Sequence, residues 1–280
     1  MKRRLGVTQS VSASRRLGVS ASRLLVVIVG LVYLFLHLPV LVLVVFSFNA
    51  SRYSVEWSGF TLQWYRELLG RADLLSGLKA SLIVGIVSTI LATALGTLLA
   101  IGMARRRARA RRMLEGFLYL PIVTPEIIAG VSLLLLFAGL GIPLGLGTIT
   151  VAHVAFNVGF VAIVVRARAE GMDHSLGEAA SLLGADELTV FRTVTIPQLG
   201  PGILAGALLA FTMSFDDYVI TSLVSGTGSS TLPMVVYGMV RRNIEPSVNA
   251  ISTVILVVTS VAIWLMVRLS RERPLATGRG

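Results

Sequence analysis

The chain has 280 residues, 55% of them hydrophobic, and its mean hydropathy of +0.83 excludes an ordinary soluble domain. It has no cysteine, which excludes disulfides, zinc–thiolate sites and thiol nucleophiles. The formal net charge is +11 and the pI about 11.1, but no basic face interleaved with aromatic residues is present, so nucleic-acid binding is not expected. The positive charge lies at the edges of apolar runs, where it is typical of topology control in a membrane protein.

Residues 1–23 form a basic, serine-rich tail that we expect to be disordered. The segment RRLGV at 3–7 recurs at 15–19, so we interpret Arg15-Arg16 as part of a repeat rather than as a twin-arginine signal. The apolar run that follows is too long for the core of a signal peptide, and no small-residue cleavage site follows it.

Apolar runs of roughly 18 or more residues recur, each long enough to cross about 30 Å of hydrocarbon as a helix. Helices are expected because lipid cannot satisfy exposed backbone groups. We predict six spans, at about 24–46, 80–103, 117–140, 148–165, 202–224 and 249–267. The predicted fold is an all-α membrane protein, with a transmembrane domain over 24–267 and a C-terminal tail over 268–280.

The distribution of arginine and lysine predicts the orientation. These residues are concentrated in the two tails and in the 104–116 loop, while the loops of the opposite face hold fewer. The positive-inside rule therefore places both termini in the cytoplasm, together with the 166–201 loop.

The segment 47–79 is then external. It holds four aromatic side chains in a polar setting, which favours a short helix at the headgroups. The alternative is a docking surface for an external partner. The aromatic residues are Trp57, Phe60, Trp64 and Tyr65.

Proline and glycine mark features inside the spans. Pro121 and Pro125 are expected to interrupt the third span near its inner end, because proline removes a backbone donor and clashes with the preceding turn. Five glycines are interpreted as positions where helices approach closely, namely Gly85, Gly96 and Gly102 of the second span and Gly202 and Gly206 of the fifth.

The 166–201 loop carries helix signals. Ser175 and Glu178 have the spacing of a capping box, and Gly184 is a natural stop for the helix that follows. Asp186 can then cap a second short helix, which Pro197 is expected to end. Taken alone, this pattern also fits an amphipathic hairpin on the membrane surface.

Residues 178–197 resemble the coupling loop of ABC importer permeases, whose pattern is Glu-Ala-Ala, three residues, Gly, nine residues, then Ile-x-Leu-Pro. Val194 and Ile196 are the two substitutions. The resemblance implies that the loop docks into an ATP-binding subunit, which drives the permease between outward- and inward-open states. The residues that it implicates are Glu178, Ala179, Ala180, Gly184, Ala185 and Pro197.

The chain has no G-x-x-x-x-G-K-[ST] motif. A separate ATPase that uses ATP with magnesium is therefore implied, and no cofactor is expected on this chain. We expect a transport subunit rather than an enzyme.

Four further segments resemble a permease subunit of spermidine/putrescine importers, at 46–49, 64–65, 214–217 and 232–250. The resemblance implies a type I importer permease in a bacterial inner membrane. It also implies alternating access, a homologous second permease, two ATP-binding subunits and an extracytoplasmic binding protein.

The acidic residues of the spans are consistent with a cationic cargo. Asp216 and Asp217 lie in the fifth span, where a charge costs a few kcal/mol or more unless it faces protein or water. Adjacent helical residues point about 100° apart, so one can line the pathway while the other pairs with a neighbouring helix or caps a break. Glu126 either contacts cargo or complements a helix N-terminus freed by proline. Tyr218 and Tyr237 complete the candidate pathway.

Two polar residues of the fourth span share one face. His153 and Asn157 are four residues apart, and we interpret them as interhelical hydrogen-bonding groups rather than ligands. No metal-binding spacing and no nucleophile–base pair is evident.

Three alternatives are open. The cargo could be another amine-bearing solute, such as an opine or an aminophosphonate. A polytopic membrane enzyme would need a catalytic cluster at one depth, which is not found. An ATP-independent carrier would have no use for the docking loop, and no inverted repeat is evident.

Overall fold

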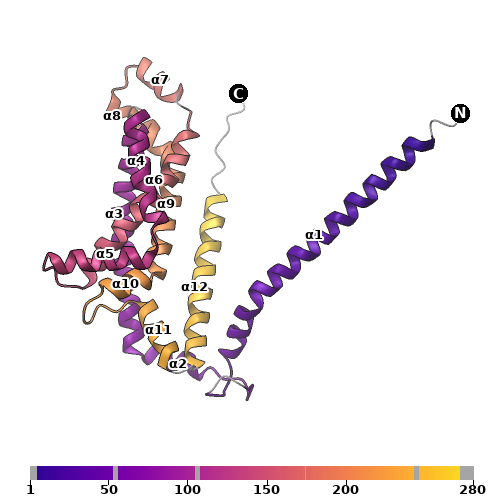
Figure 1. Ribbon diagram of the computed structural model, residues 1–280, viewed down its shortest axis with the longest axis vertical. Helices are drawn as coiled ribbons and strands as arrows, with labels where there is room; N and C mark the ends of the chain where they lie inside the picture. The colour runs from indigo at the N-terminus through magenta and orange to yellow at the C-terminus, as the bar shows by residue number, and fades with distance from the viewer. Residues whose placement is uncertain (1–4, 53–55, 105–107, 174, 243–245, 272–280) are drawn as a thin grey trace. The chain divides into compact units, whose positions relative to one another are not determined.

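The computed structural model describes residues 5–52, 56–104, 108–173, 175–242 and 246–271, and most of this backbone is helical. The chain divides into two compact units, one made of residues 1–70 and 239–280 and the other of residues 71–238 (Figure 1). The arginines at 105–107 and most of the predicted C-terminal tail lie outside the described residues.

The first unit holds α1 (Leu5–Phe46), α2 (Gln63–Gly70) and α12 (Pro246–Arg271). The predicted first span corresponds to Leu25–Phe46. α1 begins at Leu5 and so includes residues 5–23, and the disorder expected of the 1–23 tail stays a prediction. This segment has no proline, and extending an existing helix costs far less than starting a new one.

Asn49 organises the segment between α1 and α2. Its side-chain amide donates to the Glu56 carbonyl at 2.7 Å, and its backbone carbonyl accepts from the indole nitrogen of Trp64 at 2.7 Å. Trp64 is buried while Trp57 and Phe60 are exposed, so the four aromatic residues do not share one environment. α2 is the short helix expected here, and α12 packs against it and against α1.

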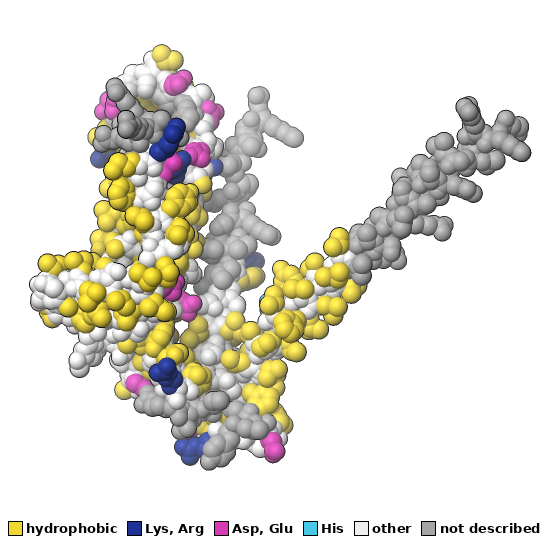
Figure 2. Space-filling model, viewed as in Figure 1, with side chains coloured by type: hydrophobic (Ala, Val, Ile, Leu, Met, Phe, Trp, Pro, Cys, Tyr) yellow, Lys and Arg dark blue, Asp and Glu magenta, His cyan; other side chains and the backbone are white. Residues whose placement is uncertain are grey.

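Three long helices form the core of the second unit. They are α3 (Ala72–Ala104), α6 (Leu146–Glu170) and α9 (Ile196–Asp216), and each packs against the other two. A Cβ at Gly96 would lie 2.7 Å from the Cβ of Val161, and one at Gly206 would lie 3.2 Å from a Val161 methyl carbon. The predicted packing role agrees with this geometry at Gly96 and Gly206, but it is wrong at Gly102, where a Cβ would meet nothing within 4 Å. Figure 2 shows apolar side chains over this body and charged ones gathered toward the end that carries α7 and α8.

The predicted third span is two helices rather than one. α4 (Ala108–Val123) and α5 (Glu126–Gly139) meet at 103°, so α5 lies across the bundle (Figure 1). The break falls at Thr124 and Pro125, while Pro121 stays inside α4. Only one of the two prolines therefore acts as predicted.

The predicted fifth span begins earlier and is broken inside. α8 (Glu187–Val190) runs through a π-helical turn at Phe191–Thr195 into α9, and together they form a stretch of 30 residues that is apolar enough to cross a membrane. The prediction that Pro197 ends the second loop helix is therefore wrong, because the helix continues through it. The Ile196 N–H bonds to the Phe191 carbonyl, and this wider turn leads into a helix that starts with proline in its first turn, where no donor is needed.

After Asp216 the chain leaves the helix and re-enters it as α10 (Val219–Val224), followed by α11 (Leu232–Arg242). The expectation of one continuous helix over 202–224 is therefore wrong. Among the described residues, four helices are long and apolar enough to cross a membrane, or five if α4 and α5 count as one span. The number of six stays a prediction.

Candidate functional site

The segment predicted to couple to an ATPase, residues 175–190, is called the coupling segment below, and it consists of α7 (Ser175–Leu182) and α8, joined through a tight turn. The Ser175 hydroxyl donates to the Asp173 carboxylate at 2.6 Å, and the Ser175 N–H donates to the same oxygen at 2.9 Å. Asp173 therefore takes the place of the predicted capping box with Glu178, because it accepts both the N–H and the hydroxyl of Ser175. The start of the helix is correct, but the capping residue is not.

Gly184 makes the turn. Its φ of +91° lies in the left-handed region, which residues with a side chain rarely adopt. The Gly184 N–H donates to the Ser181 carbonyl and the Ala185 N–H to the Ala180 carbonyl, so the last carbonyls of α7 are satisfied. The predicted stop at this glycine is confirmed.

Asp186 caps α8, as predicted. Its carboxylate accepts from the backbone N–H of Thr189 at 3.2 Å. Hydrogen bonds from the side chain and then the backbone of Thr189 hold the pKa of Asp186 below its ordinary value, since they favour the charged form. The start of the helix is thus fixed by a local bond.

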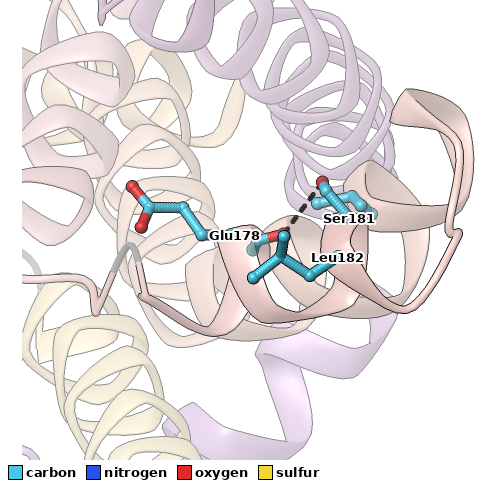
Figure 3. A pocket seen from close by; sticks show the side chains of 5 residues that line it. Glu178, Ser181 and Leu182 are labelled. Atoms are coloured by element: carbon cyan, nitrogen blue, oxygen red, sulfur yellow. Dashed lines mark hydrogen bonds between the residues drawn. The ribbon is translucent and has the colours of Figure 1, made fainter.

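The outer surface of the coupling segment is largely apolar and open. Leu182 and Leu183 are each 89% exposed, and Glu178 is also exposed. A shallow hollow lies between α7 and α8, and in Figure 3 the carboxylate of Glu178 extends away from the Ser181 hydroxyl, which donates to the Gly177 carbonyl at 3.0 Å. Ala179 and Pro197 are exposed, while Ala180 and Ala185 are half-buried.

A second candidate site is a cavity of about 440 Å³ between α5, α6, α9 and the break before α10. Four of the five predicted pathway residues line it, namely Glu126, Asp216, Asp217 and Tyr218. Tyr237 reaches it indirectly, since its ring centroid lies 4.2 Å from that of Tyr218. The remaining lining residues are His153, Phe156, Asn157, Thr212, Met213, Val219 and Ile220.

The two aspartates occupy different environments. Asp216 is exposed on the last residue of α9, as is Glu126 on the first residue of α5. Asp217 is half-buried and accepts from the N–H groups of Ile220 and Thr221 at 3.3 and 2.7 Å. Asp217 therefore caps the break, and Asp216 is the acid with a free face toward the cavity.

A buried chain of polar side chains at the wall of the cavity joins four helices, α3, α6, α9 and α10. His153 Nδ1 lies 2.6 Å from Ser214 Oγ, and Nε2 lies 3.2 Å from Asp217 Oδ2 and 3.0 Å from Thr221 Oγ1. Ser214 Oγ in turn lies 2.8 Å from Ser88 Oγ on α3. We call this set the His153 network.

The interhelical role predicted for the fourth span agrees with these contacts, and Asn157 also donates to the Ala210 carbonyl at 3.4 Å. Sequence reasoning did not identify Ser88, Ser214 or Thr221 as partners. The hydroxyl residues flanking the Asp216–Asp217 pair were the available signal. No cluster of three or more potential metal ligands occurs in the described ranges.

A polytopic helical bundle with a projecting two-helix segment and an acidic cavity defines a membrane transport subunit. Residues 92–273 match the family described as "Binding-protein-dependent transport system inner membrane component". The chain belongs to this family, and it is the permease subunit of an ABC importer.

Two permease proteins that are similar in sequence each cover most of the chain. The spermidine/putrescine transport system permease protein PotC of Shigella flexneri is 36% identical over 247 residues, covering 88% of this chain and 94% of that protein. The putrescine transport system permease protein PotI of Escherichia coli (strain K12) is 40% identical over 259 residues, covering 89% and 92%.

Solved structures share the fold. A bacterial ABC transporter involved in alginate import has a chain that aligns with a TM-score of 0.68 at 17% identity, covering 91% of this chain and 96% of that one. The MetNI methionine ABC transporter gives a TM-score of 0.59 at 18% identity, covering 76% and 99%.

Proposed function

We propose that this chain forms the translocation pathway for polyamines in an ABC importer and moves them by alternating access. The similarity to spermidine/putrescine and putrescine permeases supports the cargo class. The observation that carries the proposal is the cavity of about 440 Å³ that brings Glu126 and Asp216 together with the Tyr218–Tyr237 pair.

The chemistry of that cavity suits a protonated amine. None of the described residues that line it is lysine or arginine, so its exposed carboxylates set a negative potential. Carboxylates accept charge-assisted hydrogen bonds from ammonium groups, and tyrosine rings attract cations through their faces. Thr212 and Asn157 add neutral polar surface along the wall.

The coupling segment supplies the mechanical link. An ATP-binding subunit would cover Leu182 and Leu183, whose exposure in a polar loop is costly in water. That partner binds ATP with magnesium, and its closure moves α7 and α8. Because α8 continues through the π-helical turn into α9, movement of the segment reaches Asp216 along one helix.

The complete importer in this proposal holds a homologous second permease, two ATP-binding subunits and an extracytoplasmic binding protein. A solved relative in the alginate system is in complex with its periplasmic protein, which supports the last of these. The positive-inside rule supports an inner-membrane orientation with both termini and the coupling segment in the cytoplasm.

The test is uptake of radiolabelled spermidine and putrescine by the whole complex reconstituted in liposomes. We expect ATP-dependent accumulation that unlabelled polyamines compete away. Accumulation that opines or aminophosphonates compete away more strongly than polyamines would overturn the polyamine assignment. ATP-independent uptake would overturn the importer mechanism.

A further inference from the structure

His153 occupies a position that its neighbours define closely. Its side chain is 3% exposed, and it belongs to α6 while its partners belong to α9, the break and α10. Ser214 lies three residues before Asp217, so the imidazole contacts the chain on both sides of the exposed Asp216. A single ring thus joins the two sides of the break.

One donor and one acceptor can be assigned to every hydrogen bond that the imidazole of His153 makes. The Thr221 hydroxyl donates to Asp217 Oδ2 at 2.7 Å, which leaves its lone pairs free to accept from Nε2–H. Nδ1 can then accept from the Ser214 hydroxyl, and Ser214 from the Ser88 hydroxyl, whose one proton goes to Ser214 at 2.8 Å rather than to the Gly85 carbonyl at 3.3 Å. Each polar atom of the ring has a partner.

Hydrogen bonds to Thr221 and Ile220 occupy both carboxylate oxygens of Asp217. Its Oδ2 accepts from the N–H and the hydroxyl of Thr221 and faces His153, and its Oδ1 accepts from Ile220. The backbone of Asp217 is extended, with φ −67° and ψ 126°, so α9 cannot continue past it. Asp217 is therefore held by the protein, while Asp216 keeps its carboxylate exposed.

We propose that His153 is the positioning residue of the cavity. It holds the Asp217 carboxylate at the cavity wall, against α6 and α10, and keeps the break between α9 and α10 open, so that Asp216 is the aspartate presented to the cargo. This inference rests on the proposed function for the identity of the cargo, but its structural part can be tested separately.

We expect a specific rearrangement when the imidazole ring of His153 is removed. Without its imidazole partner, the half-buried Asp217 carboxylate lacks part of its compensation and turns toward water in the cavity. The break then relaxes and fills the space beside position 216. Residues of α9 before the break, such as Thr212, keep their surroundings.

The test uses the absence of native cysteine in this chain. Asp216→Cys is introduced into the full transporter in membranes, and its labelling by a cationic methanethiosulfonate reagent is timed. Thr212→Cys, which also lines the cavity, is the matched control. Each is combined with His153→Leu, which removes all three polar contacts of the ring, and with His153→Gln, whose amide can reach the Nε2 position.

We expect His153→Leu to slow labelling of the thiol at position 216 about tenfold, as loss of a hydrogen bond to a charged group would, and to leave labelling at position 212 within about twofold. His153→Gln restores the rate at position 216. Equal rates at position 216 in all three backgrounds, faster labelling with His153→Leu, or equal slowing at both positions would overturn the proposal.

A second arm separates the two claims. Spermidine added before the reagent should protect the thiol of the Thr212→Cys variant if polyamines enter this cavity. Lack of protection would contradict the polyamine function, while slow labelling at position 216 in the His153→Leu background would still support the positioning role.

Discussion

The coupling segment and the α9–α10 break are built in opposite ways. α7 and α8 are held by backbone bonds and by short side-chain caps within a few residues, and most of their surface is exposed. The break is held by buried contacts between residues far apart in the chain, such as Ser88 and Ser214. A segment that is locally fixed and outwardly open suits docking, whereas a break fixed by its neighbours suits a pathway whose shape depends on the bundle.

The largest effect is expected where the exposed segment meets its partner. Glu178→Lys reverses a charge on α7 without removing a described contact inside this chain, so insertion should be normal. We expect ATP-driven polyamine uptake to fall at least about 30-fold, as for a residue central to an interface. Uptake is measured in membrane vesicles and normalised to the amount of inserted protein.

Glu178→Gln is the matched control, because it keeps the shape and removes only the charge. It should retain more uptake than Glu178→Lys. Normal transport by Glu178→Lys would refute the coupling role of α7.

The two aspartates test the other side of the comparison. Asp216→Asn removes an exposed charge, so we expect polyamine uptake about tenfold lower at unchanged protein level. Asp217→Asn weakens a buried cap, so we expect less folded protein and a lower melting temperature in detergent. Uptake and thermal stability are measured for both variants, and a reversed pattern would show that the assignment of the two residues is wrong.

Close packing in the core of the second unit gives a smaller effect. Gly96→Ala places a methyl group against Val161, which should cost about 1–3 kcal/mol of stability through overpacking. Gly102→Ala on the same helix meets nothing within 4 Å and serves as the control. Chemical denaturation in detergent compares the two, and equal stability would contradict the packing role of Gly96.

The smallest effect concerns the cap of α8. The pKa of Asp186 is lowered in the folded state, so its capping contribution is present above its ordinary pKa near 3.8 and is lost as pH falls through the lowered value. Amide exchange at Thr189 should therefore become less protected at low pH. In Asp186→Ala this pH dependence should be absent, and its persistence would show that another group protects the amide.

The same contrast explains what the sequence can predict. α7, the Gly184 turn and the cap of α8 follow from residues within a few positions of one another, so local rules find them. The Asp217 break could not be found in this way, because its partners His153 and Ser214 come together only in the folded bundle. The π-helical turn before Pro197 and the cap from Asp173 were missed because each replaces a common pattern with a rarer one.

The predicted site residues illustrate the same limit. The sequence selected both Asp216 and Asp217 and left two possible roles for the pair, since adjacent helical residues diverge. Only the neighbours of Asp217 in the folded bundle show which of the two aspartates caps the break. The residues selected by charge thus lie at one cavity. The hydroxyl groups that organise it were missed, because their only signal was the position of Ser214 and Thr221 beside the aspartate pair.

Contact between α7 and an ATP-binding subunit is the most direct test of the account. Leu182→Cys provides a single thiol in this chain, and a photoactivatable crosslinker attached there is activated in inside-out membrane vesicles of the whole transporter. We predict a covalent adduct with the ATP-binding subunit, in a yield that changes when ATP is added. Labelling of the thiol at position 182 from the outer face only, with no such adduct, would contradict the account.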